Sequence, residues 1–140
     1  ITFTEGTPEW IVDWTNWTVQ RLLPDWYVNV EMVDKLEDDP EHEDFGDDRG
    51  GEIMMASENL RADVKFLNSL QDDHTGHIVV VHELCHAFVC PMSEAASRLI
   101  STKVVRKTAW KNYDAAEEQL VVRLSRALVA IRNEKSQTSQ

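Results

Sequence analysis

Residues 78–89, IVVVHELCHAFV, constrain this chain more than any other stretch, because they place an H-E-x-x-H pattern inside an apolar run. On an α-helix, residues four apart lie on one face, a single turn above each other. His82 and His86 can therefore direct both imidazoles at one metal ion, with Zn–N distances of about 2.0–2.1 Å. Glu83 lies about 100° further round the helix, where its carboxylate can act as general base for a water on the metal.

The apolar residues on both sides of the motif predict a buried helix at the edge of a core. Two histidines and a glutamate on such a helix need polar partners. Hydrogen bonds to neighbouring core residues would be one solution, but a metal ion satisfies all three groups at once. We therefore expect one Zn²⁺ ion as the cofactor. The dipeptide Cys90-Pro91 predicts the end of the helix, because a residue before proline avoids the right-handed helical region.

Charge and size narrow the class of protein. The chain has 140 residues and 42% hydrophobic residues, which fits one soluble domain over residues 1–133. The net charge of −11, from 25 acidic and 14 basic residues, argues against direct binding to nucleic acid. Since no run of 18 apolar residues occurs, no membrane association is expected. A protein or peptide is the expected partner, and the sequence does not define an oligomeric state.

The two cysteines, Cys85 and Cys90, are five residues apart on the predicted helix. That spacing is too long for a relaxed disulfide, so both are interpreted as small buried hydrophobic residues of a protein in the reducing cytoplasm. Cys85 is expected to point away from the face shared by the two histidines. The first residues also show no basic and apolar pattern typical of a secretory signal.

Before the motif, the pattern predicts one helix and three strands. The helix covers residues 8–23, with Thr7 as cap and a stripe of three tryptophans on its packing face. Alternating or apolar segments predict strands at residues 26–33, 52–57 and 60–66, with Leu60 among the inward-facing residues of the third. Together they favour an α+β fold, with a three-stranded, mostly antiparallel meander and helices on one side. The acidic segment 38–51, which includes His42, is interpreted as a solvated connection.

After these strands, helical patterns dominate. A polar turn at residues 68–76 offers Asp72, Asp73 or Thr75 as the cap of the motif helix, and His74 and His77 are excluded from the metal set because they lie off its face. Helices are predicted at residues 93–107 and 114–132, with Ser93 and Asp114 as caps and a connection between them. The tail at residues 134–140 is expected to be disordered.

A third metal ligand must come from outside the motif, because a catalytic zinc usually has three protein ligands. No histidine follows the motif, so a carboxylate is needed, and Glu117-Glu118 is the best source. Asp114-x-x-Glu117 matches a capping box, which would occupy Glu117. Helical periodicity instead places Glu117 near the middle of the buried face and Glu118 nearer its edge. Glu94 and Asp114 are weaker candidates.

HELCH followed by EEQLVVRLSRAL resembles the small zincin-like metallopeptidases of the gluzincin type, including phage-encoded members and ImmA/IrrE-type proteases. In these proteins the second helix reads E-x-x-A-x-x-F-A-x-x-L, and its first glutamate is the third zinc ligand. That position corresponds to Glu118. The resemblance covers roughly residues 60–128 and implies the small zincin-like α+β fold, with an antiparallel strand just before the motif helix. Val122 departs from the pattern of thermolysin-like enzymes, which carry there an aspartate that supports a ligand histidine.

The resemblance implies a zinc-dependent metallopeptidase that hydrolyses peptide bonds through a metal-activated water. His82, His86 and Glu118 would hold the ion, and Glu83 would accept a proton from the water and pass it to the leaving amine. Candidates for stabilising the oxyanion are Tyr113, His77 and His74. The alternatives are a zinc-binding but catalytically degenerate interaction module, and a phage accessory protein without metal.

Overall fold

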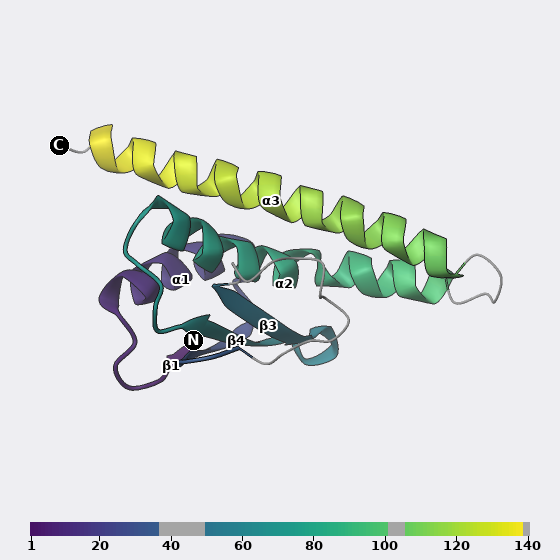
Figure 1. Cartoon of the computed structure of the whole chain (residues 1–140), viewed down its shortest axis with the longest axis horizontal. Coiled ribbons are helices and arrows are strands. Elements are labelled where there is room, and N and C mark those ends of the chain that lie inside the picture. Colours follow the sequence, from purple (N-terminus) through teal and green to yellow (C-terminus); the bar gives the residue numbers. More distant parts are fainter. Residues whose placement is uncertain (37–49, 101–105, 139–140) are drawn as a thin grey trace.

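The expected α+β architecture is present in the computed structural model, which describes residues 1–36, 50–100 and 106–138. Within these residues the chain forms three helices and a four-stranded mixed sheet (Figure 1). In chain order the elements are β1 (Thr2–Phe3), α1 (Glu9–Leu22), β2 (Tyr27–Val33), β3 (Gly51–Ala56), the short 3-10 helix η2 (Ser57–Asn59), β4 (Arg61–Leu67), α2 (His74–Ile100) and α3 (Arg106–Thr138). The acidic connection at residues 38–51, apart from its last two glycines, lies outside the described residues, and so does His42.

The strands lie in the order β1-β2-β4-β3. β2 runs parallel to both of its neighbours, β1 and β4, whereas β3 runs antiparallel to β4. Val64 of β4 is thus opposite Val30 on one side and Ile53 on the other. The three predicted strands are confirmed within one residue at either end, but the mostly antiparallel three-stranded meander is wrong. β1 was not predicted, and β4 occupies the interior of the sheet.

The alternation of apolar residues explains the buried face of the sheet but not its strand order. Val28 and Val30 of β2, and Ala62, Val64 and Phe66 of β4, are all fully or almost fully buried. This pattern specifies which side of each strand faces the core. It does not specify which strand lies next to which. Leu60, expected to face inward, is instead 40% exposed and adopts a left-handed conformation (φ 49°) just before β4.

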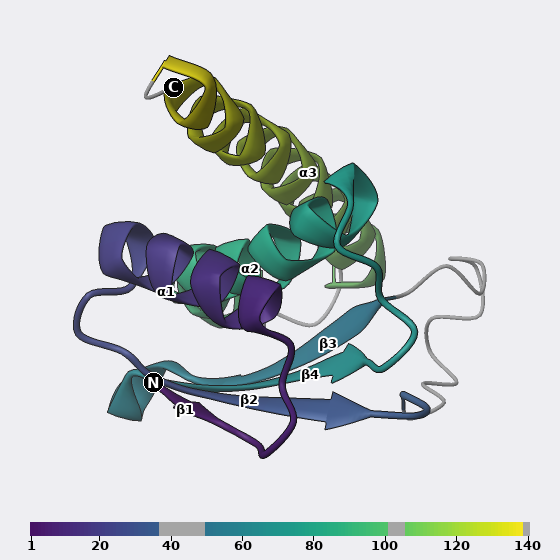
Figure 2. The same ribbon diagram turned by 90° about the vertical axis from the view of Figure 1, so that its left-hand side faces the viewer.

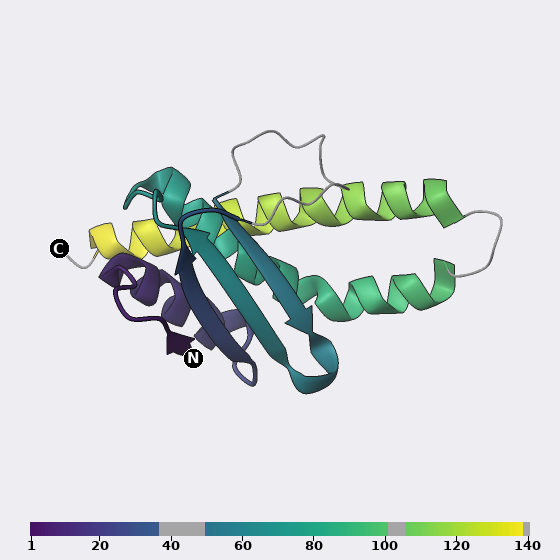
Figure 3. The same cartoon turned by 60° about the horizontal axis from the view of Figure 1, so that its bottom comes forward.

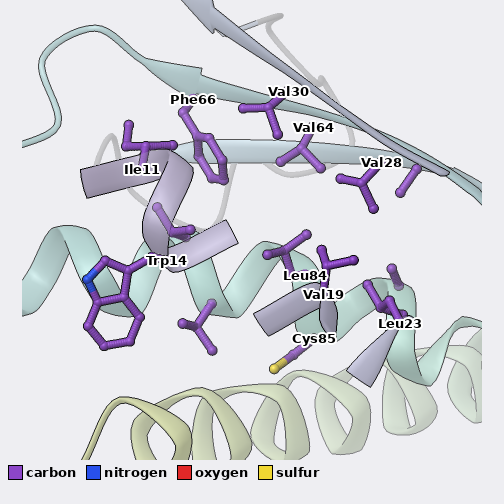
Figure 4. Packing of buried hydrophobic residues seen from close by; sticks show 14 of the residues in the cluster. Ile11, Trp14, Val19, Leu23, Val28, Val30, Val64, Phe66, Leu84 and Cys85 are labelled. Carbon is purple, nitrogen blue, oxygen red and sulfur yellow. The ribbon is translucent and has the colours of Figure 1, made fainter. Parts of the chain in front are cut away.

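All three helices lie on one face of the sheet, in two layers. Figure 2 shows α1 and α2 directly above the strands and α3 beyond them, and Figure 3 shows the sheet in front of the helices. The core fills the space between the sheet and the first helical layer (Figure 4). Its labelled members come from α1, β2, β4 and α2: Ile11, Trp14, Val19, Leu23, Val28, Val30, Val64, Phe66, Leu84 and Cys85.

The first helix confirms the prediction for residues 8–23 within one residue at each end. Ile11, Trp14 and Val19 face the core, as expected for one side of an amphipathic helix. The proposed cap is wrong, because the Thr7 hydroxyl donates a hydrogen bond to the Thr4 carbonyl and Pro8 occupies the cap position.

The motif helix α2 begins as predicted but does not end where predicted. The Asp73 carboxylate accepts a hydrogen bond from the Gly76 amide at 2.8 Å, so Asp73 provides the cap. Pro91 lies inside the helix, which continues to Ile100 and absorbs most of the helix expected at residues 93–107. A proline in a helix interior costs about 3 kcal/mol. α2 nevertheless continues past Pro91 beside α3 (Figure 1), and packing between the two helices offsets that cost.

The last helix is longer at both ends than predicted. α3 starts at Arg106, so Asp114 lies inside the helix instead of capping it, and the connection expected at residues 109–113 is helical. The segment 134–138, expected to be disordered, is also helical. α3 runs beside α2 in the opposite direction (Figure 1) and buries Val121, Ser125 and Val129. Packing along the partner helix therefore extends α3 beyond its own apolar pattern.

By length and composition alone, α2 is one helix that could cross a membrane. The core helix of a soluble protein satisfies the same criteria, and α2 contributes the fully buried Val80, Val81 and Leu84 to the core. Other apolar residues of α2, Phe88, Met92 and Leu99, are exposed.

Candidate metal centre

The two motif histidines lie one helical turn apart on the side of α2 that faces α3. Their Nε2 atoms are 3.2 Å apart, and their rings meet edge to face with centroids 4.9 Å apart. Each side chain is 20% exposed. Continuous helix on both sides of the motif produces this arrangement, because residues i and i+4 project in nearly the same direction.

Glu118 of α3 completes a group of three possible ligands. Its Oε1 lies 3.2 Å from Nε2 of His82, and its Oε2 lies 3.4 Å from Nε2 of His86. Zinc bonds of about 2.0–2.1 Å in tetrahedral directions would separate neighbouring ligand atoms by about 3.3–3.4 Å. The two Nε2 atoms are separated by about this spacing, and each of them lies at a similar distance from one of the two carboxylate oxygens of Glu118. These three residues, half-buried, are therefore placed where they can hold one metal ion.

Glu117, the alternative third ligand, lies beside the other nitrogen of His86. Its Oε1 is 3.7 Å from Nδ1 of His86, while its Oε2 accepts a short hydrogen bond from the Ser93 hydroxyl. The capping role considered for Glu117 does not apply, because α3 starts well before it. The structure thus groups Glu118, and not Glu117, with the two Nε2 atoms, although the identity of the third ligand stays a prediction.

Glu83 lies between this group and the edge strand β3. The backbone of Gly51 approaches it so closely that a Cβ added there would lie 2.9 Å from Cγ of Glu83. The negative charge of Glu83 also contributes to raising the pKa of His82, which indicates that the carboxylate is near the ring. Glu83 is therefore placed beside the ligand group without belonging to it.

The two histidines differ in their electrostatics. Burial of His82 disfavours its charged form, but the hydrogen bond to Glu118 and the charges of Glu83 and Glu118 outweigh burial, and the pKa is raised above 6.5. For His86, burial and the neighbouring His82 prevail over the two glutamates and lower the pKa. A divalent cation would satisfy the lone pairs of both rings and balance the surrounding carboxylates.

Two other residues considered in the sequence, His77 and Tyr113, lie outside the ligand group. His77 is stacked on Trp14 with ring centroids 4.6 Å apart, and its Nε2 contacts Asp72 at 2.7 Å. His77 thus belongs to the aromatic packing between α1 and α2. Tyr113 donates a hydrogen bond from its hydroxyl to Ser93 Oγ at 3.2 Å. Neither is placed as an oxyanion donor.

The cysteines take no part in the ligand group. Both are free and buried, as predicted. Cys85 is fully buried with its sulfur directed toward α3 (Figure 4), and burial raises the pKa of its thiol to about 12. The thiol of Cys90 contacts Glu94 at 3.9 Å, and its pKa is also raised, first of all by burial. Neutral thiols of this kind are poor metal ligands.

The sequence reasoning missed three residues at the site. Ser93 was interpreted only as a helix cap, Tyr113 as a possible oxyanion donor, and Gly51 as the end of a loop. The signal for Gly51 was the pair Gly50-Gly51 at the start of a strand, where a missing Cβ permits close approach of another element. No local signal identifies Ser93, because its partner is far along the chain.

Comparison of this chain with models of protein families, with curated proteins and with solved structures found no match. The function of the site is therefore inferred from its own geometry and chemistry.

Proposed function

We propose that this chain is a zinc metallopeptidase with a zincin-like arrangement, which hydrolyses peptide bonds of a protein or peptide substrate in the cytoplasm. The observation that carries the proposal is the approach of two Nε2 atoms, 3.2 Å apart, to one carboxylate: Oε1 of Glu118 lies 3.2 Å from His82 and Oε2 lies 3.4 Å from His86. Glu83 follows His82 directly on α2. Two histidines and a carboxylate are the ligand set of several catalytic zinc sites, which keep a further position open.

His82 and His86 would hold zinc through their Nε2 atoms, and Glu118 would hold it through its carboxylate. When bound, zinc would lower the pKa of a water and polarise the carbonyl of the scissile bond. The Glu118 side chain is 40% exposed, so the ligand group is in part open to solvent.

Glu83 supplies the acid–base chemistry. Its carboxylate accepts the proton of the attacking water and later gives that proton to the leaving amine. Cγ of Glu83 packs against the backbone of Gly51, where an added Cβ would lie 2.9 Å from it. Packing of this kind restricts the side chain, and restricted orientation favours proton transfer.

The substrate would lie along β3. Among the described strands β3 is an edge strand, since it pairs only with β4. An extended peptide can add to such an edge through backbone hydrogen bonds. Gly51, the first residue of β3, would bring that peptide directly beside Glu83.

The test replaces Glu83 by Gln, which keeps the shape of the side chain but removes its basicity. Wild-type protein should contain one zinc ion and cleave casein or a peptide library, and a chelator should stop the cleavage. Glu83→Gln should keep the zinc and lose at least about 100-fold in activity, the scale of a general base. Glu31→Gln, which makes the same change at an exposed position of β2, serves as the matched control.

Cleavage by Glu83→Gln at the wild-type rate would eliminate the mechanism. Purified wild-type protein without any transition metal would eliminate the zinc site itself. Tightly bound zinc with no turnover of any peptide would leave the degenerate binding module as the better description.

A further inference from the structure

The two ring nitrogens of His86 face different carboxylates. Nε2 lies 3.2 Å from Nε2 of His82 and 3.4 Å from Glu118, on the side of the proposed metal. Nδ1 lies 3.7 Å from Oε1 of Glu117. A neutral imidazole carries one N–H, and a nitrogen that binds metal must present its lone pair. If Nε2 binds the metal, the N–H of His86 is therefore on Nδ1, directed toward Glu117.

Glu117 is itself held from the opposite side. Its side chain is 18% exposed, compared with 40% for Glu118, and its Oε2 accepts the hydrogen bond of the Ser93 hydroxyl. Ser93 Oγ in turn accepts a hydrogen bond from the Tyr113 hydroxyl at 3.2 Å. The direction of donation thus runs from Tyr113 through Ser93 to Glu117, which keeps Oε1 directed toward His86.

This series of contacts connects both helices to the site. Ser93 comes from the part of α2 that follows Pro91, and Tyr113 lies one turn before Glu117 on α3. Histidine ligands of metals commonly donate their second N–H to a carboxylate, which fixes the orientation of the ring and raises its basicity. In this chain the carboxylate of Glu117 directly precedes the proposed ligand Glu118 in sequence. One turn of α3 would therefore supply both a metal ligand and the group that orients His86.

We infer that Glu117 is a positioning residue that orients His86 for metal binding, and that Ser93 and Tyr113 hold Glu117 in place. This inference rests on the proposed zinc site. Glu117 would also give a ligand histidine the carboxylate support that thermolysin-like enzymes obtain from an aspartate, at the position where this chain has Val122. A simpler reading is that the Ser93–Glu117 hydrogen bond only fastens α2 to α3, and the experiment must separate these two roles.

The experiment measures zinc affinity by competition with a chromophoric chelator for full-length wild-type protein and five variants, one of which is Glu118→Gln. Glu117→Gln should weaken zinc binding by roughly 10–100-fold, with one ion still bound. Ser93→Ala and Tyr113→Phe should each weaken it less, because Glu117 keeps its charge. Glu94→Gln, which removes a half-buried carboxylate one residue from Ser93, should leave the affinity unchanged.

Two further measurements distinguish positioning from fastening. In zinc-loaded wild-type protein, the Nδ1 proton of His86 should resonate far downfield and exchange slowly with water, and Glu117→Gln should abolish both properties. The unfolding temperature of the zinc-free protein should be nearly the same with and without Glu117→Gln. A large fall in that temperature with unchanged zinc affinity would identify a fastening role and overturn the inference.

The failure of the inference can be told apart from the failure of the proposed function. If wild-type protein binds no zinc, both are wrong. If wild-type protein binds zinc and Glu117→Gln binds it equally tightly, only the positioning role is wrong. If Glu117→Gln loses more affinity than Glu118→Gln, Glu117 is the third ligand, and the positioning role is again wrong.

Discussion

The backbone of Gly51 and the side chain of Glu83 are so close that no Cβ fits between them. A Cβ at Gly51 would lie 2.9 Å from Cγ of Glu83 and 2.9 Å from Cδ1 of Phe66, both below ordinary contact distances. The edge strand β3 is thereby placed directly against the residue proposed as general base. The glycine at this position is required by close approach and not by an unusual backbone angle.

Replacing Gly51 by Ala should therefore displace Glu83 or the start of β3. A shift of about 1 Å at a reacting group can reduce a rate about 100-fold, so we expect a loss of peptidase activity on that scale. Zinc affinity should change little, because the atoms nearest to a Cβ at Gly51 belong to Glu83 and Phe66 and not to the proposed ligands. Steady-state cleavage of a peptide and zinc competition on the same preparation check both expectations.

Gly50→Ala is the matched control. A Cβ at Gly50 would meet Leu70 Cδ2 at 2.7 Å and Val79 Cγ1 at 2.9 Å, which are apolar side chains and not Glu83 itself. Overpacking of this kind costs about 1–3 kcal/mol of stability, but it should leave cleavage intact at a temperature where the variant is folded. Equal losses of activity in both variants would show that Gly51 acts through general stability alone.

Zinc should stabilise the fold, because the candidate ligands come from two different helices. Free zinc at a concentration of about 1,000 times its dissociation constant adds about 4 kcal/mol to the free energy of unfolding. For a chain of this length that corresponds to a rise of roughly 10 °C in the unfolding temperature. Calorimetry with and without a chelator measures the shift, and His86→Ala should abolish it. No effect of the chelator on the wild-type protein would contradict the site.

The end of α3 is fastened to α1 by an arginine over two indole rings. The guanidinium carbon of Arg132 lies 3.9 Å from the ring centroid of Trp14 and 5.6 Å from that of Trp17, and burial lowers the pKa of Arg132. Arg132→Ala should lower the free energy of unfolding by about 1–2 kcal/mol, since it removes both a cation–π contact and packing of the side-chain stem. Urea denaturation measures this loss, and the exposed Arg126→Ala should show almost none.

Local patterns predicted the elements of this fold well, but contacts between distant elements decided the rest. The helix of residues 8–23 and the three long strands follow from the periodicity of apolar residues, which each segment carries by itself. The parallel pairing of β2 with β4 does not, because strand neighbours are chosen by how buried faces combine. Pro91 shows the same limit, since its local preference to end a helix is overcome by packing against α3.

For the candidate site too, the local sequence predicted one part, and contacts between distant elements decided the rest. One helical turn was enough to predict that His82 and His86 face the same point, and their Nε2 atoms do lie 3.2 Å apart. The choice between Glu117 and Glu118 depends on the rotation of α3 against α2, which the sequence of α3 alone does not define. Ser93 and Tyr113 depend on the same rotation, and on the continuation of α2 through Pro91.

The buried thiol of Cys85 should make the protein sensitive to alkali. Burial raises its pKa from 9.0 to about 12 in the folded protein. Below about pH 9 the thiol is neutral in both states, and its contribution to stability is fully present. As the pH rises from about 9 to about 12 only the unfolded thiol ionises, so the free energy of unfolding falls by up to about 1.4 kcal/mol per pH unit.

Cys85→Ala isolates this effect from the titration of other groups. The variant should be less stable near neutral pH, because a small cavity replaces the sulfur. Its stability should fall less steeply with pH, so that the difference from wild type shrinks by about 2 kcal/mol between about pH 7.5 and pH 10.5. Urea denaturation of both proteins across this range measures the difference. Parallel curves for the two proteins would mean that Cys85 ionises as readily in the folded state as in the unfolded chain, which its complete burial argues against.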